Sequence, residues 1–307
     1  MAWLKHLVLL LGLGAAAGAA SPPQQVEPPI LSVRTDLVTL SVTVVDRHGA
    51  LVPGLRAEHF TVFDNAEPQT IQFFTSDDLP ASIGLIVDSS GSMRGRRHEV
   101  MTVADGFIAM RQPLDECFSL NFNDVVWPGL PLDVDLTGDA DRLRAALTAA
   151  PAVGRTALYD AVDFGLRHLQ RATRERKALI LVSDGGDNAS RLQLDAVVDH
   201  ARRSNVLIYA VTLFDPDNRD ARPDVLKTLA RETGGRVFST RRTDDVVRAF
   251  SRIAMEIRSG YTIGFAPPEA ADHSFRSIHV AVDAGDSRPL FARTRAGYYA
   301  GPGSTVR

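Results

Sequence analysis

Apolar segments that alternate with amphipathic helical patterns dominate the middle of the chain. Helical patterns are expected near 139–149, 157–169, 192–204, 223–232 and 243–257, with another after the first apolar segment. The apolar segments are too short for helices and are typical of strands covered on both faces. They read "SIGLIVD", "CFSLNF", "KALILVSD" and "VLIYAVTL". Such alternation predicts an α/β domain over residues 81–257, with a doubly wound, mostly parallel sheet.

The segments on either side of this domain have the pattern of half-buried antiparallel strands. In "LVTLSVTVVD" apolar and polar residues alternate, and "YTIGFAP" and "SIHVAVD" show the same period near the other end. "HFTVFDN" and "TIQFF" are expected as two strands around a turn at Asn65 to Pro68. Neither segment has enough strands to be stable alone. We therefore predict that residues 31–76 and 259–300 form one small antiparallel β-sandwich into which the α/β domain is inserted.

The first residues resemble an export signal. Lys5 and His6 precede an apolar run, Leu7 to Ala20, which is shorter than the roughly 20 residues of a spanning helix. We expect a signal peptide over 1–20, followed by a Pro- and Gln-rich linker over 21–30; an uncleaved N-terminal anchor is the alternative. No later stretch has spanning length. The mature chain is therefore expected to be exported, either periplasmic or secreted.

Composition is that of a soluble globular protein. Hydrophobic residues make up 45% and charged residues 23% of the chain, and the formal net charge is −3. This balance gives no general attraction to nucleic acid or to anionic lipid. Cys117 is the single cysteine and cannot form an intrachain disulfide. It lies in a predicted strand, which favours a buried structural thiol.

The first strand of the α/β domain ends in "DSSGS", which places three oxygen-bearing side chains at its carboxyl end: Asp88, Ser90 and Ser92. Asp184 ends the strand in "LILVSDGGDN", and Thr156 begins a predicted helix in "VGRTALYDA". Ligands of open α/β sheets bind at the carboxyl ends of strands. The five side chains are therefore expected to meet at one edge of the sheet.

These side chains offer only hard oxygen donors, which suit Mg²⁺ or Mn²⁺ with several waters. Two carboxylates balance a dication, while the hydroxyls add no charge. The metal would thus keep its attraction for a carboxylate from outside. Such a site would bind a glutamate or aspartate of a partner protein.

Each donor also has an ordinary structural interpretation. A serine or threonine can cap a helix, and an aspartate can shape a turn. Asp187 and Asn188 are expected mainly to shape their loop. Exposed arginines near the motif are expected to be solvated or to favour an acidic partner. These arginines are Arg94, Arg96, Arg97 and Arg155.

Asp88, Ser90 and Ser92 in "DSSGS", followed in order by Thr156 and Asp184, resemble the metal-ion-dependent adhesion site of von Willebrand factor A domains. The resemblance covers roughly 81–257, and the flanks are similar to a bacterial exported subgroup of related proteins. It implies a Rossmann-like fold and a Mg²⁺ held by Ser90, Ser92 and Thr156. It further implies that the two aspartates hold the metal directly or through water.

Three functions are consistent with the sequence. The first is a non-catalytic, exported adhesion or scaffold module that engages a partner's acidic side chain through the metal. The second is a component of an envelope assembly in which the metal only rigidifies loops. The third, a Mg²⁺-dependent phosphoester hydrolase, is disfavoured because no lysine lies between Lys5 and Lys177. The sequence sets neither the partner nor the oligomeric state.

Overall fold

The computed structural model describes residues 37–148, 152–213, 221–268, 273–286 and 288–301. The expected signal peptide, residues 1–20, and the expected linker, residues 21–30, lie outside these ranges. In the described part of the chain, no helix combines the length and the apolar character needed to cross a membrane.

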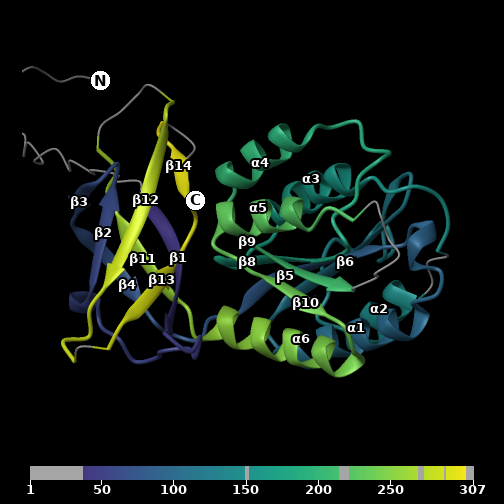
Figure 1. The fold of residues 1–307 in the computed structure, drawn as a ribbon, viewed down its shortest axis with the longest axis horizontal. Helices are drawn as coiled ribbons and strands as arrows, with labels where there is room; N and C mark the ends of the chain where they lie inside the picture. Colours follow the sequence, from purple (N-terminus) through teal and green to yellow (C-terminus); the bar gives the residue numbers. More distant parts are fainter. Residues whose placement is uncertain (1–36, 149–151, 214–220, 269–272, 287, 302–307) are drawn as a thin grey trace, which may run out of the picture. The chain divides into compact units, whose positions relative to one another are not determined.

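A six-stranded sheet forms the centre of the α/β domain (Figure 1). The spatial order is β10-β9-β8-β5-β6-β7, and every neighbouring pair is parallel except β6 and β7. The strands are β5 (Ala81–Asp88), β6 (Glu116–Phe122), β7 (Val126–Pro128), β8 (Arg176–Val182), β9 (Val206–Leu213) and β10 (Val237–Thr240). The predicted mostly parallel α/β fold is confirmed.

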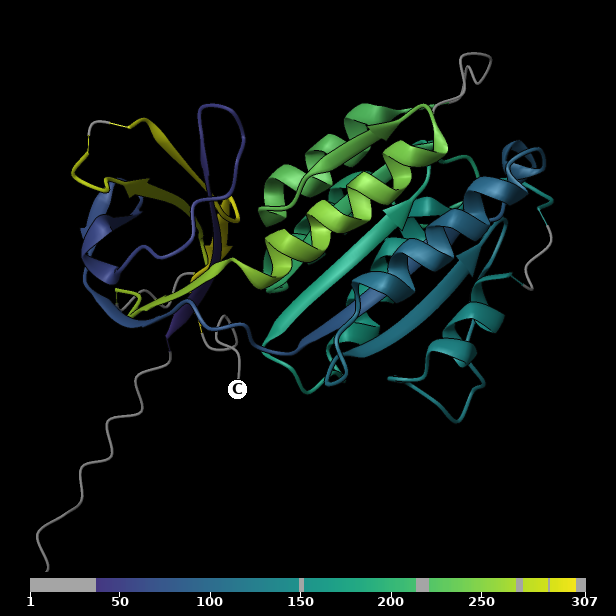
Figure 2. The same cartoon turned by 90° about the horizontal axis from the view of Figure 1, so that it is seen from below.

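Helices cover both faces of this sheet, as Figures 1 and 2 show. One face carries α3 (Leu158–Leu169), α4 (Leu194–Arg203) and α5 (Pro223–Thr233). The other carries α1 (Arg97–Met110), α2 (Ala140–Thr148) and α6 (Thr243–Arg258). Each of α3 to α6 buries one apolar stripe against the sheet.

Burial on both faces explains why polar and apolar residues do not alternate along the central strand, β5. All eight residues of β5 are buried, because β6 and β8 pair with both of its edges and helices cover both faces. Gly165 lets α3 approach closely: a Cβ there would lie 2.7 Å from Cδ1 of Ile86. Cys117 is buried in the same core, and burial raises the pKa of its thiol to about 12, as fits a structural thiol.

The two ends of the described chain form an antiparallel β-sandwich. Its sheets have the orders β13-β1-β11-β4 and β14-β12-β2-β3. The first comprises β1 (Val38–Asp46), β4 (Ile71–Thr75), β11 (Tyr261–Phe265) and β13 (Leu290–Arg293). The second comprises β2 (Phe60–Asp64), β3 (Glu67–Gln69), β12 (Phe275–Val282) and β14 (Gly297–Tyr299). Both sheets thus combine strands from before and after the α/β domain, which is an insertion.

A buried polar cluster accompanies the apolar core of the sandwich. Asp64 is fully buried; both of its carboxylate oxygens accept hydrogen bonds from Nε of Arg276, at 2.8 and 2.9 Å. The hydroxyl of Tyr298 donates to Oδ2 at 2.8 Å. These three contacts satisfy a charge that would otherwise be costly to bury.

The turn expected at Asn65 to Pro68 is shorter than predicted. Asn65 and Ala66 both have positive φ, at 48° and 69°, which makes a two-residue hairpin between β2 and β3. The chain then crosses over, so β4 pairs with β11 in the other sheet and not with β2. The two strands expected in "HFTVFDN" and "TIQFF" are present as β2 and β4, but the turn between them leads into β3 and the two strands belong to different sheets.

Candidate metal site

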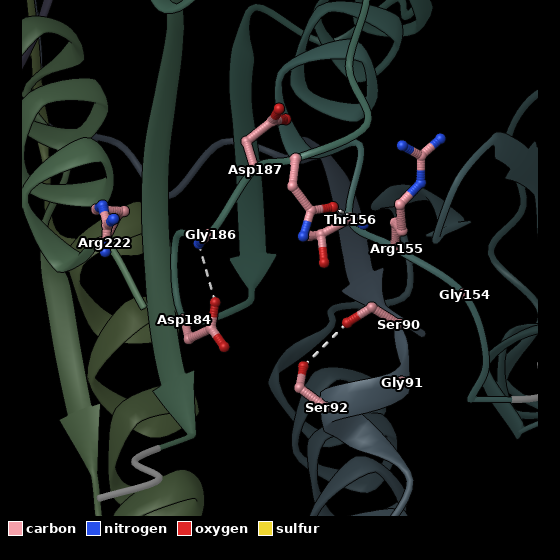
Figure 3. A pocket seen from close by; sticks show the side chains of 11 residues that line it. Ser90, Gly91, Ser92, Gly154, Arg155, Thr156, Asp184, Gly186, Asp187 and Arg222 are labelled. Atoms are coloured by element: carbon pink, nitrogen blue, oxygen red, sulfur yellow. Dashed lines mark hydrogen bonds between the residues drawn. The ribbon is translucent and has the colours of Figure 1, made fainter. Parts of the chain in front are cut away.

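Asp88, the last residue of β5, is buried next to the loop that carries Ser90 and Ser92. Asp88 is 2% exposed; its Oδ1 accepts the N–H of Ser90 at 2.9 Å. Its Oδ2 accepts the hydroxyl of Ser183 at 3.0 Å. The Oγ atoms of Ser90 and Ser92 lie 3.0 Å apart, as Figure 3 shows. The carboxylate is therefore held by its own loop, through Ser90, and by the residue that follows the neighbouring strand β8, through Ser183.

Main-chain hydrogen bonds join the loop that carries Thr156 to the first loop. The N–H of Gly91 donates to the Gly154 carbonyl at 3.0 Å. From the other side, the side-chain oxygen of Asn188 accepts the Thr156 N–H at 2.9 Å, and the Asn188 N–H donates to the Thr156 carbonyl at 2.9 Å. Thr156 is thereby held between the two neighbouring loops.

The third loop follows β8 and contains Asp184. Its Oδ1 accepts the N–H of Gly186 at 2.9 Å, and its carbonyl accepts the N–H of Arg222 at 3.1 Å. Gly185 has φ of +88°, and a Cβ there would lie 2.3 Å from the Arg222 carbonyl oxygen. Only glycine fits this close approach of the loop to the start of α5.

The three loops enclose a pocket of about 280 Å³ (Figure 3). Its lining includes four of the five predicted donors: Ser90, Ser92, Thr156 and Asp184. Asp88 does not line the pocket but bonds to Ser90 behind it. The structure therefore brings four of the predicted residues from three separate loops to one pocket, and it ties the fifth, Asp88, to that pocket through Ser90.

Electrostatics at the site favour a bound cation. The pKa of Asp88 is raised to about 6; burial is the largest cause and the nearby charge of Asp184 adds to it, while hydrogen bonds from Ser90 and Ser183 partly oppose both. A buried carboxylate beside a second carboxylate is stabilised by a positive ion. No group of three or more His, Cys, Asp or Glu side chains suited to a metal occurs among the described residues. A metal here would thus depend on the hydroxyls as well as the two carboxylates, a donor set that suits Mg²⁺ or Mn²⁺.

Both aspartates shape their turns as the ordinary interpretation expects, because each accepts the N–H of the residue two positions later, whereas helix capping by Ser90 or Thr156 is not seen. Ala157, and not Thr156, is the N-cap residue of α3, and it makes no side-chain cap. Ser90 is the N-cap residue of the short 3₁₀ helix Gly91–Met93, yet its side chain makes no cap hydrogen bond. The hydroxyl of Ser90 is paired with Ser92 instead. The serine and threonine hydroxyls are thus not explained by helix capping.

Residues that the sequence did not identify as central also shape the site. Asp187 accepts hydrogen bonds from the Tyr159 N–H and from Ser190, so it anchors the start of α3. Arg222 lines the pocket and was not predicted. The sequence signal nearest to it is Pro223, which marks the start of α5. Arg155 also lines the pocket and pairs with Asp124 at 2.9 Å.

Of the other predicted arginines, Arg94 and Arg96 do not line the pocket. Arg96 lies 3.9 Å from Glu99 on its own helix. The side chain of Arg97 lies outside the described part of the structure. Among the described residues, positive charge at the pocket therefore comes from Arg155 in the second loop and from Arg222 just before α5, and not from the serine loop.

Solved structures that resemble this chain include one that supports the fold and two that align at lower scores. A von Willebrand factor type A protein from Catenulispora acidiphila aligns with a TM-score of 0.53 and 13% identity, over 88% of this chain and 75% of that one. BatB from Bacteroides thetaiotaomicron aligns at 0.48 and 14%, over 58% and 97%. The von Willebrand domain of the type V pilus tip protein Mfa5 from Porphyromonas gingivalis aligns at 0.47 and 12%, over 59% and 95%.

No curated protein matches the sequence. The family model described as von Willebrand factor type A domain matches residues 82–252. This match covers more than half of the chain and includes all three loops of the site. The chain therefore belongs to the von Willebrand factor type A domain family.

Proposed function

We propose that the protein is an exported, non-catalytic binding module that holds Mg²⁺ or Mn²⁺ and, through it, a carboxylate of a partner protein. Ser90, Ser92, Thr156 and Asp184 would hold the ion, with Asp88 directly or through water. One observation carries the proposal: three loops bring the three hydroxyls and the carboxylate of Asp184 to a single open pocket, with Asp88 hydrogen-bonded to Ser90 next to it. When bound, the ion would supply the positive charge that attracts an outside carboxylate.

The surroundings of the pocket support an acidic partner. The guanidinium groups of Arg155 and Arg222 lie on different sides of the predicted donors in Figure 3. Arg155 is exposed and can reach solvent-borne ligands. Positive charge at the rim of a site increases the rate at which an acidic partner associates.

The chemical make-up of the pocket favours binding over catalysis. Its described lining holds no lysine, histidine or cysteine that could act as a base or nucleophile. Lys177 lies at the start of β8, the opposite end from Asp184, and donates to the Leu169 carbonyl at 2.9 Å. The phosphoester hydrolase is therefore the less favoured reading. A purely rigidifying ion is also disfavoured, because the pocket is lined by exposed residues such as Ser92.

Metal binding tests the first part of the proposal. Calorimetric titration of Mg²⁺ and Mn²⁺ into chelator-stripped protein should show saturable binding. Asp88→Ala should abolish it, while Asp141→Ala, which removes an exposed carboxylate on α2, should not. Absence of binding by the folded wild-type protein would refute a site loaded before the partner arrives.

Ligand selection tests the second part. A random peptide display library would be panned on the immobilised protein in Mg²⁺ and eluted with chelator. Enriched peptides should contain an essential glutamate or aspartate, whose change to glutamine or asparagine abolishes binding. Enrichment without acidic residues, or binding that persists in chelator, would contradict the proposed role of the metal.

A further inference from the structure

A second hollow, of about 560 Å³, lies away from the metal site. Residues of α5, β10, β12 and the segment 292–296 line it. Five of the lining residues are lysine or arginine, one is His279, and none is acidic. We call it the basic groove. Lys227 and Arg231 on α5, with Arg236 just before β10, are exposed on its border.

Positive side chains outnumber the carboxylates around the basic groove, although its rim cations each have an acidic neighbour: Lys227 lies 2.9 Å from Asp224 and Arg231 lies 3.2 Å from Glu232. Glu256 is fully buried and is shared by three guanidinium groups: Arg252 at 3.0 Å, Arg236 at 3.7 Å, and Arg293. Arg295 is also buried and contacts the ring of Tyr298, with no ion pair to any described residue. A cluster of cationic side chains that outnumbers the carboxylates around it attracts an anionic ligand.

Beneath the charges the groove is apolar. Ala230, Ile278 and Val280 line it and are buried, and Val237 is half-buried. An inorganic anion would gain nothing from such a floor, whereas a peptide with alternating acidic and apolar side chains would use both the rim and the floor.

The edge strand of the α/β sheet, β10, borders the same groove. β10 is the last strand of the sheet order and pairs with β9 on one side only, within the described chain. The N–H of Ala210 in β9 donates to the Arg236 carbonyl at 2.9 Å, and Ala210 is the register partner of Val237. In a parallel ladder this places the main-chain groups of Val237 and Ser239 on the side away from β9. Both residues line the groove.

We propose that the basic groove binds an extended acidic segment of a partner protein, which adds as a strand along β10. Main-chain hydrogen bonds to Val237 and Ser239 would hold the segment. Its carboxylates would pair with Lys227, Arg231 and Arg236 on the rim. Strand addition at an exposed sheet edge is a recurring mode of peptide recognition, with side-chain pockets providing specificity. This site is independent of the metal site and requires no ion.

The test uses a capped synthetic peptide of about eight residues that alternates glutamate with valine. Its binding to the full chain would be measured by fluorescence anisotropy in the presence of chelator, so that the metal site does not contribute. One control peptide replaces glutamate by glutamine. A second keeps the glutamates but carries N-methyl groups on alternate peptide bonds, which removes the hydrogen bonds a paired strand needs.

Two protein variants separate the contribution of the rim charges to peptide binding from that of the main-chain hydrogen bonds along β10. Arg236→Gln removes one rim charge. Ser239→Pro removes an N–H that points away from β9, so the ladder within the sheet stays intact. Circular dichroism and thermal unfolding verify that each variant is folded, and Asp141→Ala serves as the matched surface control.

The glutamate peptide should bind, and each of the two control peptides should bind at least about tenfold more weakly. Ser239→Pro and Arg236→Gln should each weaken binding of the glutamate peptide by about tenfold, with no effect of Asp141→Ala. No binding by the folded protein overturns the proposal. It is equally overturned if N-methylation and Ser239→Pro have no effect. Binding to vesicles of anionic lipid, without binding to the peptide, would also overturn it.

Discussion

The burial of Asp88 leads to a prediction opposite to the usual expectation for a metal-site mutation: Asp88→Asn should stabilise the metal-free protein. Burial raises the pKa of Asp88 from 3.8 to about 6, so the folded state binds a proton more tightly than the unfolded chain does. The stability that this side chain contributes is complete below pH 3.8 and is lost as the pH rises through 6. The charged carboxylate then costs at most about 3 kcal/mol.

Asparagine fits the same contacts without the charge. Its side-chain oxygen can accept the Ser90 N–H, and its amide can donate to Ser183 Oγ, which now donates to Asp88. In chelator above pH 6, we expect Asp88→Asn to raise the free energy of unfolding by about 1–3 kcal/mol. The gain should shrink as the pH falls toward 3.8. Urea unfolding, followed by circular dichroism at several pH values, measures it.

Added Mg²⁺ should reverse the order of stability. A ligand that binds only the folded state stabilises it in proportion to RT ln(1 + [L]/Kd), so the wild-type protein should gain stability and Asp88→Asn should not. Asp141→Asn, with its side chain 96% exposed, is the control and should change neither measurement. A variant that is less stable than the wild type in chelator above pH 6 would refute the electrostatic reasoning. Equal stabilisation of both proteins by Mg²⁺ would refute the role of Asp88 in metal binding.

Three further substitutions test the loops and the sandwich. Asn188→Ala removes the clamp on Thr156 and should weaken Mg²⁺ binding by about 10-fold or more in calorimetry, with the fold retained. Gly185→Ala places a Cβ against the Arg222 carbonyl and should cost about 1–3 kcal/mol of stability, together with metal affinity; unchanged urea unfolding would contradict this. Asp64→Ala leaves the half-buried Arg276 without its carboxylate and the Tyr298 hydroxyl without its acceptor, and it should destabilise the protein by about 1–3 kcal/mol in the same assay, whereas no loss would show that the pair is dispensable.

The sequence predicts the α/β domain well because its strands are long and buried on both faces. The continuous apolar runs of β5 and β8 identify these segments as buried strands. The three-residue strands β3 and β7 were missed, because so short a segment carries no measurable alternation. The hairpin between β2 and β3 was also missed. Ala66 adopts a positive φ there, a conformation that its residue type does not announce.

In the candidate site, too, the residues next to long buried strands are predictable, whereas the contacts between loops are not. Asp88 ends the buried strand β5 and Asp184 lies two residues after the end of β8, so the sequence alone places them at one edge of a parallel sheet. The contacts of Asn188 with Thr156, and of Arg222 with the Asp184 loop, join segments that no local pattern relates. They arise from how the loops pack once the sheet exists. The basic groove is likewise invisible in the sequence, because its charges come from segments that are far apart along the chain.

The insertion of the α/β domain into the sandwich has a consequence for the order of folding. The Tyr261 hydroxyl binds the Leu55 N–H and the Val52 carbonyl across 206 and 209 residues, and β1 pairs with β11 over a similar separation. Closing so long a loop in a disordered chain is entropically costly, and such non-local pairing is slow. Once the α/β domain has folded, it holds together the chain ends that lead into the sandwich strands. The sandwich should therefore form last, and destabilisation of the α/β core should unfold both regions together.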